Sequence, residues 1–409
     1  MKYGLVYFIY NSTIKLYLFF LSFFKVKKNR ILLHQPFKFG YDCNPRYIAE
    51  ELIKRKIFDE IIWVTRSTRA ENAKYPPEIK VVSESDVFKL LYYFSTSFIC
   101  ISNSYFGVEK FNFKKKKQIF IDTWHGALGI KKIGMAEHKN LQDQESSKEI
   151  IKQKIGLVDI FISNSDFETD VYKKALLFDK KIYKFGHPRN DVFFENSSYY
   201  IDKLKAKENI KEFLKNKFDE NKKIVLYAPT FRHTACNDCY DLDYNLLLAL
   251  LEEKFNEKFI LALKFHPTTH FISRSIVKES DRIFDFTCYT DMQGLMAVSD
   301  IMLTDYSSCI FDFMLQRKPA FVYASDIDEY NTERGFFYPL ETTPFPIIKN
   351  NNELKNKILN FNEQEYKNNV EQFLREKGCL EDGYASERVV DLIESLLGKK
   401  LSEELSEIV

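Results

Sequence analysis

The segment SDIMLTDYSSCIFDFMLQRKPAFVYA (residues 299–324) contains two short apolar runs separated by a polar turn and an amphipathic stretch. Residues 300–304 and the run PAFVYA are largely apolar without alternation, which is typical of strands buried on both faces of a parallel sheet. The helical stretch between them begins near Ser307. A strand, a helix and a second strand in this order predict a βαβ unit of an α/β fold.

The same alternation extends over most of the chain. Strands are predicted at ILLHQ, EIIWVTR, SFICIS, QIFIDTW, VDIFIS and KIYKFG, and then again at KIVLYAP, KFILALKFH, RIFDFT, DIMLTD and PAFVYA. Helices are predicted between strands of the first series at NPRYIAEELIKRK, SDVFKLLYYF and SDFETDVYKKALLF. Each of these helices opens with a residue suited to N-capping, namely Asn44, Ser85 or Ser165.

A polar, charged and helical stretch at residues 199–222 separates the two series of strands. We therefore expect two Rossmann-like, doubly wound domains that face each other across a cleft, preceded by an apolar N-terminal helix. The expected boundaries are 1–28 for a membrane-associating segment, 29–205 for an N-terminal acceptor domain and 206–395 for a C-terminal donor domain with a closing helix.

Composition sets the broad class of the protein. The chain has 409 residues, of which 45% are apolar and 29% are charged, and this balance suits two large globular domains. The formal net charge of +2 argues against a nucleic-acid binder. Seven cysteines scattered along so long a chain indicate reduced thiols in a cytosolic setting.

The N-terminal stretch LVYFIYNSTIKLYLFFLSFFKVKKNR is apolar and then basic. A signal peptide would carry its charge first, and polar residues interrupt the run too early for a spanning helix. Asn11, Lys15, Ser22 and Lys25 form a narrow polar stripe on a helix, which predicts a helix lying in the interface of an anionic membrane. The alternative is an ordinary packed terminal helix. The tract KKKK (114–117) is expected to be a solvated loop, for which a position facing the membrane is one option.

Chemically versatile residues gather where the predicted strands end, which is the edge at which open α/β sheets bind ligands. The groups are Trp124-His125-Gly126, GHPRND (186–191), APTFR (228–232), His266-Pro267 and Asp305-Tyr306-Ser307-Ser308. A single polar group after one strand would mean little, but polar groups after several strands indicate a binding site. They predict a polar site in the cleft.

Several of these residues suit a phosphate group. Ser307 and Ser308 open a helix, whose N-terminal N–H groups favour anions, although plain capping would also explain two serines. Lys264 and His266 are two residues apart at a strand end and share a face, which suits an anion clamp. Arg232 adds a planar donor fork that matches phosphate geometry.

His125 has the chemistry of a general base. A histidine titrates near neutral pH and can take a proton from a hydroxyl group. Gly126 allows a ligand to approach the backbone, and Lys131 and Lys132 can meet an anionic acceptor. The alternative is a structural histidine packed beside Trp124.

The sequence holds two weaker metal-like patterns. His233, Cys236 and Cys239 provide three ligands of the four that a structural zinc site needs, and no second pair stands at a suitable distance. Asp241 and Asp243 form a DxD motif, which is too short to be specific. The sequence therefore predicts no bound metal.

Seven motifs occur along the chain in a fixed order: TWHGALGIKKIG, GHPRND, YAPTFR, KFHP, the segment around TDYSS, RGFFY and EDGYASERVV. This order is typical of CDP-glycerol glycerophosphotransferases, and the chain resembles this family over roughly residues 30–395. The resemblance implies a GT-B-like fold. It also implies transfer of a polyol phosphate, glycerol phosphate first, from a CDP-polyol to a lipid-linked, capsular or teichoic-type acceptor, with release of CMP. It further implies peripheral attachment to the cytoplasmic face of the membrane.

The resemblance also implies roles for single residues. His125 matches the general base and His266 the second functional histidine, while Thr304, Asp305, Ser307 and Ser308 match the donor-binding turn. The acceptor side is expected to include Trp124, Gly126, Lys131 and Lys132. Here the chain has Ala127-Leu128-Gly129-Ile130, where members of the family often have Thr-Pro-Leu-Lys. No metal is required, and Mg²⁺ on the pyrophosphate is compatible with the scheme. The alternatives are a GT-B sugar transferase and a non-catalytic membrane-associated binding protein.

Overall fold

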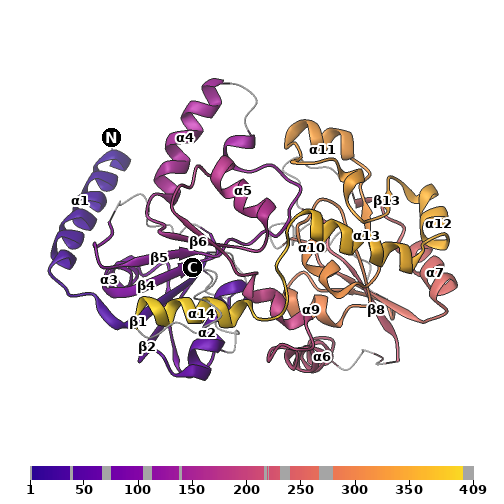
Figure 1. Ribbon diagram of the computed structural model, residues 1–409, viewed down its shortest axis with the longest axis horizontal. Helices are drawn as coiled ribbons and strands as arrows, with labels where there is room; N and C mark the ends of the chain where they lie inside the picture. Colours follow the sequence, from indigo (N-terminus) through magenta and orange to yellow (C-terminus); the bar gives the residue numbers. More distant parts are fainter. Residues whose placement is uncertain are drawn as a thin grey trace.

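The computed structural model describes residues 2–36, 40–66, 75–104, 113–137, 141–215, 219, 221–230, 240–266 and 280–398. Two β-sheets lie at the two ends of an elongated molecule, and helices cover them (Figure 1). The strand pairings within both sheets are parallel. The α/β class with parallel sheets is confirmed.

The first sheet has seven strands in the order β3-β2-β1-β4-β5-β6-β7. They are β1 (Lys27–Gln35), β2 (Glu60–Thr65), β3 (Ile79–Ser83), β4 (Ser97–Ser102), β5 (Ile119–Asp122), β6 (Ile160–Ser163) and β7 (Lys181–Lys184). The second sheet has six strands in the order β10-β9-β8-β11-β12-β13. They are β8 (Lys223–Tyr227), β9 (Phe259–Leu263), β10 (Ile283–Asp285), β11 (Ile301–Thr304), β12 (Ala320–Tyr323) and β13 (Ile347–Ile348).

The helices around the first sheet are α1 (Lys2–Ser22), α2 (Cys43–Arg55), α3 (Val87–Thr96), α4 (Leu141–Ile155) and α5 (Asp166–Ala175). A short 3₁₀ helix, η4 (Pro188–Phe193), and α6 (Asp202–Phe213) lead into the second half. The later helices are α7 (Tyr244–Phe255), α9 (Met292–Val298), α10 (Cys309–Phe313), α11 (Ile327–Glu333), α12 (Asn351–Leu359), α13 (Glu363–Glu376) and α14 (Ala385–Leu396).

The buried strands show why continuous apolar runs form this sheet. Successive side chains of β1 point to opposite faces, so Ile31 and Leu33 join one core while Leu32 joins the other. Helices α2 and α14 cover the first of these faces, and α1 and α3 cover the second. Two edge strands were not predicted, because β3 exposes Val81 at 42% and β13 has only two residues.

Two helix starts differ from the predicted ones. Helix α2 is capped by Asp42 and α3 by Asp86, whose carboxylates accept backbone N–H bonds, rather than by Asn44 and Ser85. Carboxylates at an N-cap also interact favourably with the helix dipole. The third predicted cap, Ser165 of α5, is confirmed by its bond to the N–H of Glu168.

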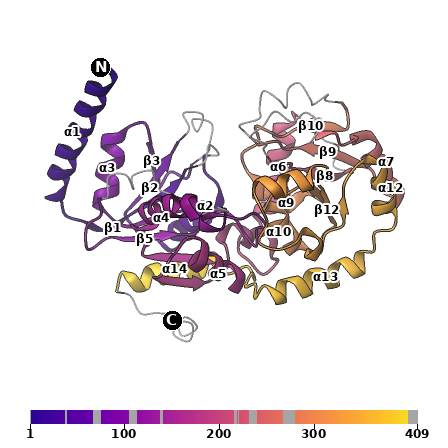
Figure 2. The same ribbon diagram turned by 90° about the horizontal axis from the view of Figure 1, so that it is seen from above.

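The C-terminal part of the chain returns to the first half. Helix α13 lies along the second half, and α14 then crosses to the first (Figure 2). Val389 and Ile393 of α14 are fully buried in the core formed with α2 and the first sheet. Asp191 of η4 fixes this return, because its carboxylate accepts the backbone N–H groups of Ala385 and Ser386 at 3.0 and 2.8 Å. Helix α14, the last helix of the described chain, therefore packs against the first half of the molecule.

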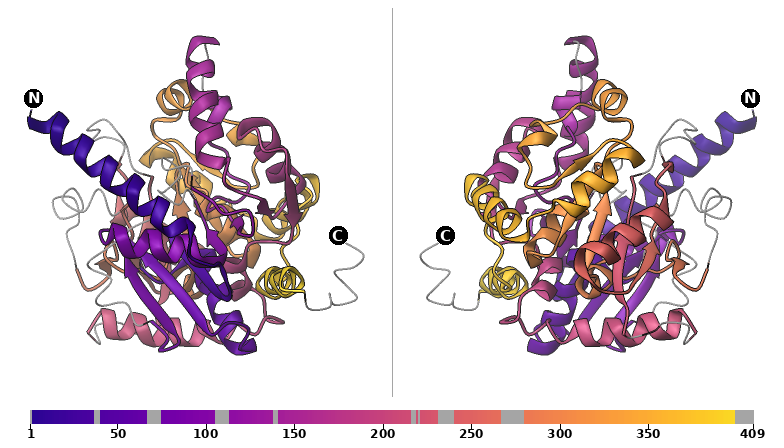
Figure 3. Two further views of the ribbon diagram at one scale, coloured as in Figure 1. Left: turned by 90° about the vertical axis from the view of Figure 1, so that its left-hand side faces the viewer. Right: turned by 90° about the vertical axis from the view of Figure 1, so that its right-hand side faces the viewer.

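Helix α1 leans against the first sheet at one end of the molecule (Figure 3). Ile14, Leu18 and Leu21 pack into the core beside α3. Lys115 donates hydrogen bonds to the carbonyls of Leu21 and Phe24, so the KKKK tract is only partly a solvated loop. Within the described residues, no helix combines the length and hydrophobicity needed to cross a membrane.

Candidate functional site

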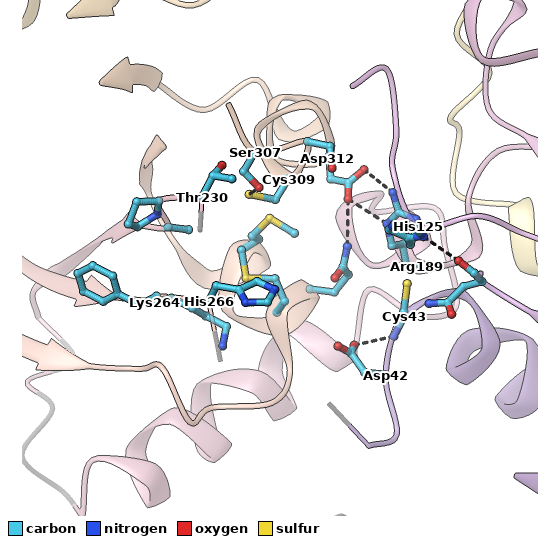
Figure 4. Close-up of a pocket in the computed structure, with 18 of the residues that line it drawn as sticks. Asp42, Cys43, His125, Arg189, Thr230, Lys264, His266, Ser307, Cys309 and Asp312 are labelled. Carbon is cyan, nitrogen blue, oxygen red and sulfur yellow. Dashed lines mark hydrogen bonds and ion pairs between the residues drawn. The ribbon is translucent and has the colours of Figure 1, made fainter. Parts of the chain in front are cut away.

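A pocket of about 610 Å³ lies between the two halves of the molecule (Figure 4). Its first-half wall includes Gln35, Asp42, Cys43, Asn103, His125, Lys131 and Arg189. Its second-half wall includes Thr230, Lys264, His266, Gln293, Ser307, Ser308, Cys309, Asp312 and Arg334. The site therefore combines residues that follow strand ends of both sheets, as expected for parallel α/β folds.

The turn after β5 is built to present His125. Trp124 adopts a left-handed backbone conformation with φ of 51°, which is uncommon for a bulky residue and costs about 1–3 kcal/mol. The Asp122 carboxylate accepts the Trp124 N–H at 2.7 Å, and the Asn44 amide donates to the carbonyls of Thr123 and Trp124 at 3.0 Å each. These bonds hold the turn in the conformation that projects His125 into the pocket.

The protonation state of His125 is set by its surroundings. Its Nδ1 lies 2.9 Å from the backbone carbonyl of Asn103, an acceptor, so Nδ1 carries the proton and Nε2 is the basic nitrogen. Part of the His125 side chain is exposed to the pocket, but the surrounding protein limits its contact with bulk water and lowers its pKa to about 4. Nearby cationic groups such as Arg189 add to this effect. His125 is therefore neutral at physiological pH, which is the form that can accept a proton from a hydroxyl group.

Thr304 and Asp305 hold the second-half loops together. The Thr304 hydroxyl donates to the Ala228 carbonyl at 2.6 Å, and the side chain is fully buried. The Asp305 carboxylate accepts the backbone N–H and the hydroxyl of Thr230. These two residues of the predicted donor-binding turn thus connect the ends of β8 and β11, and neither belongs to the lining of the pocket.

Ser307 and Ser308 both line the pocket. Helix α10 begins directly after them, close to the predicted start near Ser307, and has five residues. Ser308 is its N-cap residue and makes no capping bond through its side chain, so plain capping does not explain this serine. The Cys309 thiol lies 3.0 Å from the Ser307 hydroxyl.

Lys264 and His266 also line the pocket, as their spacing predicted. The Lys264 ammonium is nevertheless bonded to protein, because it donates to the carbonyls of Tyr289 at 2.6 Å and Phe286 at 3.3 Å. Burial lowers the pKa of Lys264 to about 8. Burial also lowers the pKa of His266, so a neutral imidazole faces the pocket.

Arg189 is a pocket residue that sequence reasoning did not select. Its Nε and Nη2 donate to the two carboxylate oxygens of Asp312 at 2.9 and 3.1 Å, and both side chains are buried. Nη1 is buried without a hydrogen-bond partner among the described residues. The motif GHPRND contained this arginine, but nothing in the sequence connected η4 of the first half with α10 of the second.

Three of the four predicted acceptor residues, Trp124, Gly126 and Lys131, line a second pocket of about 220 Å³. Trp124 and Gly126 line it, and His125, Lys131, Ser308 and Arg334 line both pockets. A Cβ on Gly126 would stand 3.3 Å from the Trp124 indole nitrogen, so a side chain here would crowd the turn. Lys132 lies outside the lining of both pockets, and its side chain packs near Gly335.

Arg232, His233, Cys236 and Cys239 lie outside the described residues. In the part of the chain that the structure describes, no three His, Cys, Asp or Glu side chains gather in a group that could hold a metal ion. The role of Arg232 stays a prediction.

Comparison with known proteins identifies relatives of this chain. The chain is 29% identical over 369 residues to the teichoic acid poly(glycerol phosphate) polymerase of Bacillus spizizenii, a match that covers 88% of this chain and 89% of the relative. It is 30% identical over 322 residues to the teichoic acid ribitol-phosphate primase of the same species, which covers 76% of this chain and 78% of the relative. A solved structure of the wall teichoic acid polymerase TagF has the same fold, with a TM-score of 0.77, 24% identity and coverage of 92% of this chain and 91% of that one.

The family model for CDP-glycerol:poly(glycerophosphate) glycerophosphotransferases matches residues 16–395. This span contains both sheets, the turn that carries His125 and the serines at the start of α10. The chain therefore belongs to the CDP-glycerol:poly(glycerophosphate) glycerophosphotransferase family.

Proposed function

We propose that this protein transfers a polyol phosphate from a CDP-polyol to an acceptor hydroxyl and releases CMP, within a two-domain, GT-B-like architecture. The observation that carries the proposal is the interdomain pocket, where a neutral His125 from one half faces Ser307, Ser308 and His266 from the other. A base and an anion site on opposite walls suit phosphoryl transfer, which depends on positioning and charge stabilisation.

The chemistry follows from this placement. The acceptor oxygen attacks the phosphorus that carries the polyol, and His125 Nε2 takes the hydroxyl proton. The bond from that phosphorus to the oxygen shared with CMP breaks, and the electron pair leaves with CMP. As negative charge develops on the phosphate oxygens, these oxygens accept hydrogen bonds from Ser307, Ser308, His266 and the Nη1 of Arg189.

Glycerol is the first choice of polyol. Relatives named for glycerol phosphate and for ribitol phosphate both match the chain, and a TagF variant has been solved after soaking with CDPG. The acceptor is proposed to be lipid-linked and of teichoic or capsular type, and it enters through the 220 Å³ pocket. Mg²⁺ bound to the pyrophosphate is compatible with this scheme.

A donor screen tests the proposal. Purified protein should be incubated with CDP-glycerol, CDP-ribitol and a UDP-sugar in the presence of a lipid-linked glycerol phosphate acceptor, and the released nucleotide should be measured. We expect CMP from at least one CDP-polyol. Release of UDP from the sugar donor without CMP would instead support a sugar transferase, and no released nucleotide would support a binding protein.

The serine pair should be needed for donor binding. Replacing both Ser307 and Ser308 by alanine removes two hydroxyl donors to the pyrophosphate, each worth about 1.5–3 kcal/mol when the partner is charged. Calorimetry with CDP-glycerol should show binding weaker by about 100-fold or more, since the two losses together amount to at least about 3 kcal/mol. Unchanged affinity in the double variant would show that these hydroxyls do not bind the donor.

Attachment to the cytoplasmic face of a membrane is the second part of the proposal. Helix α1 buries Ile14, Leu18 and Leu21 but exposes Phe19 and Phe20 by 62% and 64%, and Phe23, directly after the helix, is exposed by 71%. The exposed Lys25, Lys27 and Lys28 follow at once in the chain. An exposed aromatic face beside basic residues suits the interface of an anionic membrane.

Removing the aromatic face should release the protein from vesicles. The variant Phe19→Ser/Phe20→Ser/Phe23→Ser should lose sedimentation with anionic vesicles, while high salt should weaken wild-type binding only in part. Ile201→Ser/Leu204→Ser is a matched control, because these exposed residues, at the N-cap and in the first turn of α6, lie far from α1 (Figures 1 and 2). Equal sedimentation of the α1 variant and the control would contradict the attachment proposal.

A further inference from the structure

Asn103 is a buried pocket residue to which neither the sequence motifs nor the proposed chemistry gives a role. It directly follows β4, so it lies between Gln35 at the end of β1 and the His125 turn at the end of β5. All three residues line the 610 Å³ pocket. The three adjacent strands therefore bring two amide side chains and the proposed base to one edge of the sheet.

The two polar ends of Asn103 have different environments. Its backbone carbonyl accepts the Nδ1–H of His125. Its side chain is fully buried, and neither Nδ2 nor Oδ1 has a hydrogen-bond partner among the described residues. The Cys43 thiol lies beside the amide, but a thiol is too weak a partner to satisfy it. A buried amide without partners is costly, which indicates a group that a ligand completes.

The hydrogen-bonding groups of the Asn103 amide indicate which part of the donor it can bind. An amide offers both a donor and an acceptor, as a hydroxyl does, whereas a phosphate offers only acceptors at neutral pH. Asn103 lines the pocket that also contains Ser307 and His266, and it is absent from the lining of the 220 Å³ pocket. It therefore lies on the donor's side of His125. We propose that the Asn103 amide binds a hydroxyl of the transferred polyol and so selects the donor; this inference rests on the proposed function.

The test compares donors that differ by one hydroxyl. CDP-glycerol and the two CDP-propanediols, each of which lacks one free hydroxyl of glycerol, should be compared by kcat/KM. Wild-type protein should prefer CDP-glycerol over at least one analogue by about 10- to 100-fold, because the analogue leaves a buried polar group unpaired. In Asn103→Ala this preference should fall to within about threefold. The control Asn356→Ala, at an exposed position of α12, should keep the wild-type preference.

Two further readouts separate binding of the polyol from a structural role. The backbone carbonyl remains in every variant, so the pH profile governed by His125 should not move. Asn103→Leu, which removes an unsatisfied polar group at similar volume, should melt no lower than wild type but should lose the preference.

An unchanged preference in both Asn103 variants would overturn the inference and leave the proposed function standing. An equal loss for all three donors with a shifted pH profile would also overturn it, since Asn103 would then act only through His125. If wild-type protein releases CMP from none of the donors, the proposed function fails and this inference falls with it.

Discussion

His125→Ala should lower turnover by about 10²–10⁴-fold, the usual contribution of a general base. Binding of CDP-glycerol should change little, because His125 belongs to the first half and the residues proposed to hold the pyrophosphate belong mainly to the second. His266→Ala should weaken donor binding as well, since His266 would contact the phosphates in the ground state and the transition state. Steady-state kinetics and calorimetry on both variants separate the two roles.

The pH profile gives an independent check on His125. The pKa of His125 is lowered to about 4, below the ordinary value near 6.5, so the neutral imidazole persists as the pH falls from 7 to about 5. The acid limb of kcat/KM that belongs to this group should therefore lie near pH 4, and it should be missing from the residual activity of His125→Ala. Recovery of activity on return to pH 7 controls for unfolding. Near-normal turnover of His125→Ala would show that His125 is not the general base and has only a structural role beside Trp124.

Breaking the ion pair between Arg189 and Asp312 should have the second large effect. The carboxylate also accepts bonds from the amides of Asn190 at 3.2 Å and Gln293 at 3.3 Å, so one buried anion connects residues of both halves. Arg189→Met would leave the carboxylate buried without its counter-charge. Removing one partner of a buried pair costs about 3–5 kcal/mol, and the unfolding midpoint should fall accordingly.

A double variant distinguishes stability from activity at this pair. Arg189→Met/Asp312→Leu replaces both charges by apolar groups, which is often neutral for stability. We expect it to recover most of the unfolding midpoint lost in Arg189→Met, but not turnover, because no guanidinium group would face the transferred phosphate. Wild-type stability of Arg189→Met, or wild-type turnover of the double variant, would contradict this role.

The parallel sheets were predictable because their strands are buried on both faces. Ile31, Leu32 and Leu33 are each fully buried, so a continuous apolar run was a sufficient signal. The edge strand β3 could not be recognised in this way, since exposed Val81 interrupts its burial. Local helix starts were predicted less well, because Asp42 and Asp86 competed with neighbouring Asn and Ser residues for the same capping role.

Part of the candidate site was also predictable from the pattern of parallel strands. His125, His266, Ser307 and Ser308 follow strand ends directly, and parallel topology then brings them to one cleft. Arg189 and Asp312 are 123 residues apart and belong to different halves, so their pairing depends on how the halves pack. Asn103 also follows a strand, but its significance comes from the missing partners of its amide, which only the three-dimensional surroundings show.

The most direct measurement follows the oxygen that joins the two phosphorus atoms of CDP-glycerol. The bridging oxygen should be labelled with the heavy isotope, and the products of a single turnover with the acceptor should be analysed by mass spectrometry and phosphorus NMR. We expect labelled CMP and a new phosphodiester on the acceptor, because the bond between the glycerol phosphorus and the bridging oxygen breaks. Release of labelled CDP, with glycerol transferred without its phosphorus, would contradict it.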